Sequence, residues 1–142
     1  MRRTFVVIAW LLLSASSAEG QTVCGYVAAN PKPPVSKGLY PVSIAQVDGK
    51  KVDGRDSARV KLLVGPHSIG VVERVADDRR GRARLEELGI NQKSAALKLI
   101  DIDVQADGSY LLGAQLIAEP GQGGSDDYWE PVVWRKLVDS CR

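Results

Sequence analysis

The segment Pro66-His67-Ser68-Ile69-Gly70 differs by one residue from the Gly-x-Ser-x-Gly elbow that presents the nucleophile of serine hydrolases. The elbow needs glycine on both sides of the serine, because a strand turns sharply into a helix there, and Pro66 replaces the first glycine. A triad also needs a histidine as general base. His67 is the only histidine in the sequence, and adjacent side chains of a strand point to opposite faces. We therefore predict a turn between two strands here; a Ser–Lys dyad stays open, but no pattern points to one.

Acidic and glycine-rich stretches lack the spacing of a metal or phosphate site. Asp101, Asp103 and the pair Asp107-Gly108 share residue types with an EF-hand loop, but extra residues separate them and apolar residues alternate with them as in a strand. Zinc is disfavoured as well, because the sequence has one histidine and its two cysteines are expected to form a disulfide bond. Segment 121–124 lacks the Lys-Ser/Thr pair of a phosphate loop. We expect no metal and no cofactor.

One run of positive charge over 79–84 is a candidate surface for phosphate, a polyanion or lipid headgroups. Acidic pairs at 77–78 and 86–87 flank it, so the local charges nearly cancel and a solvated segment is the favoured interpretation. The candidate contact residues are Arg79, Arg80, Arg82 and Arg84.

Three aromatic residues near the C-terminus form a second candidate interaction surface, since aromatic side chains often anchor interfaces. They are Tyr128, Trp129 and Trp134. The chain beyond residue 20 has no phenylalanine and no methionine, so its core needs bulk from other residues. We therefore favour a core position for these aromatic side chains.

The two cysteines, Cys24 and Cys141, stand near the two ends of the chain beyond residue 20. An even number of cysteines in an exported protein predicts a disulfide bond between them. Two separate buried thiols are the alternative. A redox role is not expected, because the Cys-x-x-Cys spacing that lowers a thiol pKa is missing.

Residues 1–20 have the order of features of a secretory signal peptide: Arg2-Arg3, an apolar run over 5–13, and small residues over 14–18. The run is too short for a membrane span, which needs roughly 20 apolar residues. Cleavage after Gly20 is preferred to cleavage after Ala18, and residues 21–142 then form one domain. Loss of 1–20 lowers the net charge from +2 to +1, which predicts no affinity for nucleic acid or an anionic membrane. We expect a periplasmic or secreted protein with no transmembrane segment and no lipid anchor.

Short apolar segments alternate with Gly, Pro and Asp turns beyond the leader, which predicts an all-β, antiparallel β-sandwich of about seven strands. At most one short helix is expected, over about 82–88, with Gly89 ending it. The apolar phase slips near Leu99, which predicts a β-bulge, and segment 106–109 predicts a hairpin turn. The predicted strands span 22–28, 40–47, 58–64, 67–75, 94–104, 110–118 and 128–138.

Three stretches, SIAQVDGKKV, ARVKLLVGPHSIGVV and LKLIDIDVQADGSYLLGAQL, resemble small exported bacterial domains of the PEGA and transthyretin-like carboxypeptidase-regulatory types. The resemblance covers 43–116 and depends mainly on turn residues. This chain departs from the pattern with Gly65-Pro66 in place of Pro-Gly, and with Ser109-Tyr110-Leu111 in place of a Tyr pair. The resemblance implies a sandwich used for surface attachment or assembly, and it carries over no catalytic residue.

Three functions follow from these patterns. The leading hypothesis is a non-enzymatic exported β-sandwich that binds a protein or a cell-envelope component. The first alternative is an inhibitor or immunity protein that blocks a secreted enzyme by inserting segment 77–93 or 119–125. The second, and least favoured, is a small hydrolase that uses Ser68.

Overall fold

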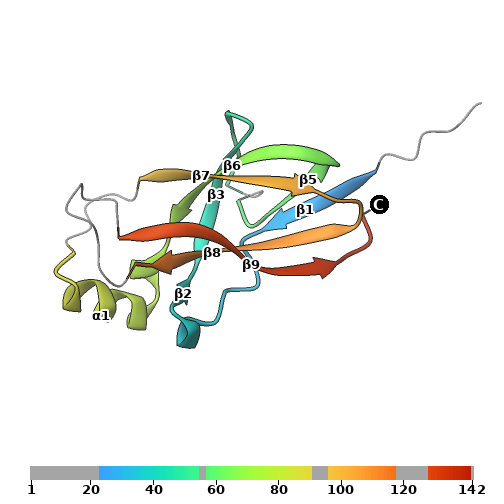
Figure 1. Ribbon diagram of the computed structural model, residues 1–142. Helices are drawn as coiled ribbons and strands as arrows, with labels where there is room; N and C mark the ends of the chain where they lie inside the picture. Colours follow the sequence, from blue (N-terminus) through green and yellow to red (C-terminus); the bar gives the residue numbers. More distant parts are fainter. Residues whose placement is uncertain (1–22, 55–56, 91–95, 118–127, 142) are drawn as a thin grey trace, which may run out of the picture.

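The computed structural model describes residues 23–54, 57–90, 96–117 and 128–141. Nine strands lie in these ranges and form two sheets whose inner faces enclose one core (Figure 1). Seven strands have five or more residues and two have only two, so the predicted all-β sandwich is confirmed. The leader expected at 1–20 and the glycine-rich segment 119–125 lie outside the described residues.

The first sheet is built around β8 (Gly108–Leu116). On one side β8 pairs antiparallel with β9 (Trp129–Val138). On the other side it pairs parallel with β1 (Cys24–Ala28) and antiparallel with β2 (Leu39–Tyr40). The edge beyond β1 is β5 (Arg59–Leu63), antiparallel to β1. Strands from four distant parts of the sequence therefore meet in this sheet.

The second sheet has the order β4-β3-β6-β7 and is antiparallel throughout. Its strands are β3 (Val42–Val47), β4 (Lys50–Lys51), β6 (Gly65–Glu73) and β7 (Leu97–Val104). β3 carries a bulge at Ala45, where the register with β6 shifts between Ile44 and Gln46.

The core is mainly aliphatic, with tyrosine and tryptophan as its aromatic members. Each fully buried aliphatic side chain contributes on the order of 1.5–3 kcal/mol relative to exposure. The largest fully buried hydrophobic side chains are Trp129, Ile44, Ile69, Leu112, Val27, Val71, Val75 and Val104.

The predicted bulge near Leu99 is wrong, because β7 pairs with β6 in one unbroken register from Leu97 to Val104. Leu97 and Leu99 are simply exposed, by 41% and 56%. Lys98 occupies the inner phase instead, where its ammonium donates to the Trp129 carbonyl at 2.5 Å and lies 4.9 Å from the Trp129 ring centroid. A bulge does occur in β9, where Trp134 is the extra residue opposite Leu111 and Leu112.

The predicted hairpin at 106–109 is also wrong in its pairing. The chain does turn there, with Asp107 at a φ of 55°, but β7 and β8 lie in different sheets and do not pair with each other. Asp107 donates its backbone N–H to the Cys24 carbonyl at 2.9 Å, so the turn is held by β1. The segment therefore crosses from one sheet to the other.

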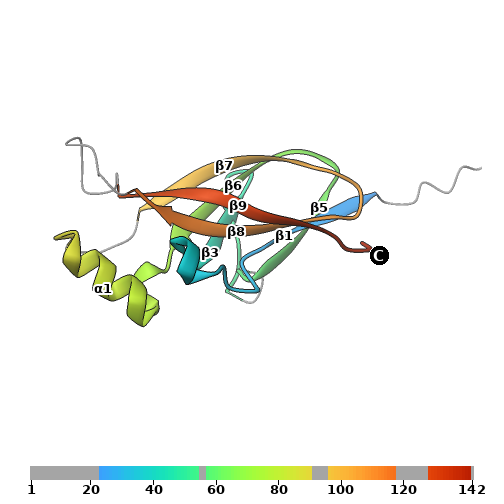
Figure 2. The ribbon, with the colours of Figure 1, turned by 60° about the horizontal axis from the view of Figure 1, so that its bottom comes forward.

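The single helix in the described ranges, α1 (Arg79–Glu87), lies at the end of the sandwich opposite the C-terminus (Figures 1 and 2). Two short 3-10 turns, Val35–Lys37 and Val75–Asp77, precede β2 and α1. The Asp78 carboxylate caps α1 by accepting from the backbone N–H groups of Arg80 and Gly81 at 2.8 and 3.1 Å. Gly89, at a φ of 68°, follows the helix as predicted, and the helix begins three residues earlier than expected.

Candidate functional site

His67 lies in β6, and both of its ring nitrogens contact oxygen acceptors. Nδ1 is 2.7 Å from Asp48 Oδ2, and Nε2 is 2.7 Å from the backbone carbonyl of Leu63. The side chain is only 15% exposed. His67 therefore connects β6 to the turn after β3 and to the end of β5.

Asp48 is held in place from two sides. Its Oδ1 accepts from the Ser68 backbone N–H at 2.8 Å, and its own N–H donates to the Ser68 carbonyl at 2.8 Å. Its backbone has a φ of 50°, in the left-handed region that aspartate tolerates better than most residues. The turn Asp48-Gly49, which leads from β3 into β4, is thus attached to the middle of β6.

The Asp48–His67 pair has the form of the base half of a catalytic triad, and no local pattern in the sequence indicates it. In a triad, the histidine Nε2 serves the nucleophile. Here Nε2 is occupied by the Leu63 carbonyl, and Ser68 contributes its backbone to Asp48. Ser68 pairs across β6 and β7 with Asp101, while His67 pairs with Ile102, so their side chains point to opposite faces of the sheet. This arrangement does not bring Ser68 Oγ to its base.

The two charges stabilise each other. The hydrogen bond to the Asp48 carboxylate, followed by the bond to the Leu63 carbonyl, raises the pKa of His67 despite desolvation. The hydrogen bond from His67, with the Ser68 N–H, lowers the pKa of Asp48. The pair is therefore an ion pair in mildly acidic solution.

A solvent-open cleft of about 350 Å³ lies beside Asp48, between β4 and β5. These are the outer strands of the two sheets, so the sandwich is open along this side. On the other side, Lys98 of β7 bonds to Trp129 of β9 and links the sheets. The floor of the cleft is aliphatic and its rim is charged; its lining residues are Val47, Val52, Val60 and Leu62, with Asp48, Lys50, Lys51 and Asp53.

The sequence offered no signal for this cleft. Its residues come from the β3–β4 hairpin and from β5, and they meet only through the packing of the two sheets. Lys50 and Lys51 are ordinary exposed residues of a polar turn when read along the chain. The cleft therefore joins the predicted candidates as a new one.

Of the aromatic candidates, Tyr128 and Trp129 are 3% and 0% exposed and belong to the core, the position that the sequence analysis favoured. The Tyr128 hydroxyl donates to the buried carboxylate of Glu73 at 2.6 Å. Glu73 also accepts from the Val75 backbone N–H at 2.5 Å, which fixes the corner before α1. Trp134 is half-buried on β9. These residues do not form one exposed aromatic patch.

The arginine candidates separate into two kinds on α1. Arg82 donates to the Ala76 carbonyl at 3.0 Å, and Arg84 pairs with Glu87 at 2.7 Å. Arg79 and Arg80 are exposed in the first turn. The charged run is therefore a solvated helix, partly engaged with its own end of the molecule.

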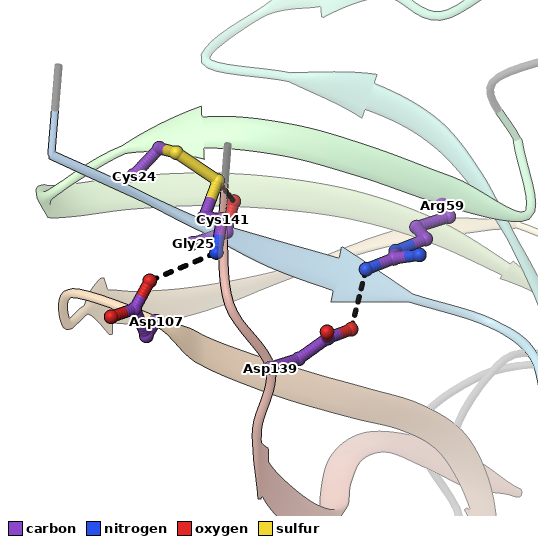
Figure 3. A network of polar contacts seen from close by, with 6 residues as sticks. All are labelled: Cys24, Gly25, Arg59, Asp107, Asp139 and Cys141. Carbon is purple, nitrogen blue, oxygen red and sulfur yellow. Dashed lines mark hydrogen bonds and ion pairs between the residues drawn. A yellow bond between two sulfur atoms is a disulfide. The ribbon is translucent and has the colours of Figure 1, made fainter.

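The predicted disulfide joins Cys24 and Cys141, with Cα atoms 5.6 Å apart, and is confirmed (Figure 3). Polar contacts hold the C-terminal segment next to it. The Cys141 N–H donates to Asp107 Oδ1 at 2.9 Å, and Arg59 pairs with Asp139 at 2.5 Å. The Arg59 guanidinium lies 3.7 Å from the ring centroid of Tyr26. The start of β1 and the segment after β9 are thus fastened together at one end of the sandwich.

Comparison with family models, with curated proteins and with solved structures finds no match to this chain. Within the described ranges, no three His, Cys, Asp or Glu side chains gather as metal ligands would. Nor does any described helix have the length and apolar character needed to cross a membrane.

Proposed function

We propose that this chain is an exported, non-enzymatic β-sandwich that binds a protein or a cell-envelope component. The observation that carries the proposal is the open cleft between β4 and β5, where an aliphatic floor is combined with a charged rim. Binding sites commonly combine an apolar concave surface with a few polar groups that orient the ligand. We place the binding site there.

Two further observations support an exported binding domain. The disulfide is compatible with an oxidising compartment such as the periplasm or the extracellular space. The resemblance of 43–116 to PEGA and transthyretin-like domains, which carries over no catalytic residue, supports a role in binding or assembly. All the cleft-lining residues, 47, 48, 50–53, 60 and 62, fall inside the resembling region.

Site-specific photo-crosslinking in envelope extract tests the binding site. A crosslinking residue at position 51, on the cleft rim, should give a discrete adduct, whereas one at position 136 should not. Lys136 is the matched control, since it is an exposed lysine on β9, the other edge of the first sheet. No adduct from position 51 would refute the proposed binding site. Adducts of equal yield from positions 51 and 136 would show that the contact is not specific to the cleft, and would also contradict it.

The same experiment separates the inhibitor alternative from the leading function. An adduct with a secreted lytic enzyme, followed by loss of that enzyme's activity, would identify an inhibitor.

N-terminal sequencing of the protein recovered from the envelope tests export. Recovery of a chain that begins near Gln21 is expected, and recovery of Met1 from most of the protein would contradict export.

A further inference from the structure

His67 of β6 contacts the segments that lead to the two walls of the cleft. Its ring contacts Asp48, the first residue of the turn into β4, and the carbonyl of Leu63, next to the cleft residue Leu62 in β5. β4 forms one wall of the cleft and β5 the other. A single side chain in β6 therefore contacts both the turn that leads into one wall and the end of the strand that forms the other.

Each of the two contacts of His67 needs its own proton, one on Nδ1 and one on Nε2. A carbonyl oxygen and an ionised carboxylate only accept hydrogen bonds, so each ring nitrogen must donate. A neutral imidazole has one N–H, and only the imidazolium has two. Loss of one proton therefore breaks one of the two ties and leaves a lone pair facing an oxygen at 2.7 Å.

Asp48 is the charged group that contacts His67, and the other charged residues of the neighbouring strands either favour the ionised form of Asp48 or lie on other faces of the sheets. Lys50 of β4 acts on Asp48 and favours its ionised form. On β7, Asp101 and Asp103 pair with Ser68 and Pro66, so they point to the opposite face of the sheet from His67. On β5, the charged residues 59 and 61 alternate with the inward-facing Val60 and Leu62 and lie on the outer face of the first sheet.

We propose that His67 is a pH-dependent latch on the cleft: as imidazolium it holds the Asp48 turn and the end of β5 in place, and as neutral imidazole it releases one of them. The role of the cleft itself rests on the proposed function; the latch does not. Release of the turn would loosen the wall that carries Lys50 and Lys51, and Asp48 on the rim would lose the positive charge that His67 places beside it.

The direction of the pH effect follows from the two ionisations. His67 has a raised pKa in the folded protein, so its contribution is fully present below the pKa of a free histidine, about 6.5, and is lost as pH rises through its folded value. Asp48 has a lowered pKa, so its contribution is present above about 3.9 and is lost as pH falls through its folded value. The latch is therefore closed in mildly acidic solution.

An NMR titration of the whole protein tests the latch directly, since His67 is the only histidine and its ring signals are unambiguous. We expect His67 to titrate above the pKa of a free histidine. Amide hydrogen-exchange protection, corrected for intrinsic exchange, should fall several-fold across the same transition on the side that is released. Release of the turn lowers it at Ser68, which donates to Asp48, and at Val52, which donates to Ala45; release of the end of β5 lowers it at Val64, which donates to Val23.

Asp48→Asn removes the carboxylate charge and keeps a residue that tolerates the left-handed backbone. It should lower the pKa of His67 and abolish the pH dependence of protection. Asp101→Asn makes the same chemical change on the far face of β6 and β7, and it should leave both measurements unchanged. A wild-type His67 that titrates at or below the pKa of a free histidine, or protection that is constant across the titration at Ser68, Val52 and Val64 alike, would overturn the latch.

These measurements use no ligand, so they succeed or fail independently of the proposed function. If the latch titrates as expected and position 51 gives no adduct, the binding role is wrong and the latch stands. If position 51 gives an adduct of equal yield well below and well above the midpoint found in the NMR titration, the binding role stands and the latch does not control it.

Discussion

At Ser68, the backbone is used to hold Asp48 and the side chain lies on the other face of the sheet from His67. We predict that Ser68→Ala leaves binding of the crosslinked component intact and changes the free energy of unfolding by at most about 1.5 kcal/mol, the size of one hydrogen bond. A fluorophosphonate probe measures the alternative. Labelling of the wild type that disappears in Ser68→Ala would make this protein a hydrolase.

The surroundings of His67 could be predicted from the sequence only in part. The sequence argued against an elbow, because Pro66 and the single histidine are visible in it. The turn predicted for segment 66–70 is wrong in its place, since that segment lies within strand β6, which begins at Gly65. The partner of His67 is not visible, since Asp48 lies 19 residues away and reaches it only through the pairing of β3 with β6. A side chain whose partner is fixed by tertiary structure gives no local signal.

At the scale of elements, α1 is packed closely on the corner before it, and Gly81 makes that approach. A Cβ at residue 81 would lie 2.2 Å from the Val75 carbonyl oxygen and 2.9 Å from Tyr40 Cδ1. An ordinary Gly→Ala change in a helix stabilises it by up to about 1 kcal/mol. We predict that Gly81→Ala instead lowers the free energy of unfolding by about 1–3 kcal/mol, through overpacking.

Urea unfolding measures this change, and Ala83→Gly is the matched control. Ala83 is exposed on the same helix, so its loss should cost only the intrinsic helix preference of roughly 1 kcal/mol. A Gly81→Ala variant that is more stable than the wild type would show that α1 does not rest on the Val75 corner as described.

The positions of the strands and the helix were predicted better than the pairing between strands. Period-two patterns and turn residues located the seven longer strands and the helix, but β7 was misjudged because Lys98 faces inward and Leu97 and Leu99 face solvent. Its turn at 106–109 carries hairpin residues, yet it crosses between sheets because β8 pairs with β1 and β9. Local propensity records the turn, whereas the choice of partner strand depends on the whole fold.

At the scale of the whole molecule, the Cys24–Cys141 bond closes a loop across a separation of 117 residues. We predict that the double variant Cys24→Ser/Cys141→Ser loses about 2–5 kcal/mol of unfolding free energy, because its unfolded chain is no longer constrained. Urea titrations with and without reductant measure this loss. The double variant should not respond to reductant, and a wild-type protein whose two thiols are alkylated in the native state would contradict the bond.

The cleft between β4 and β5 is the central element of this account, and a matched pair of valine substitutions tests it. Val52 lines the cleft, whereas Val138 is 92% exposed at the end of β9, away from it. Val52→Glu places a charge on the apolar floor, and Val138→Glu makes the same change on a solvated surface. A cooperative unfolding transition in each variant establishes that both are folded.

The deciding measurement is the calorimetric affinity of each variant for the component crosslinked at position 51. Val52→Glu should weaken binding by at least about tenfold, equivalent to about 1.4 kcal/mol, while Val138→Glu stays within about twofold of the wild type. Equal affinities of the two variants, or a loss confined to Val138→Glu, would contradict a binding site between β4 and β5.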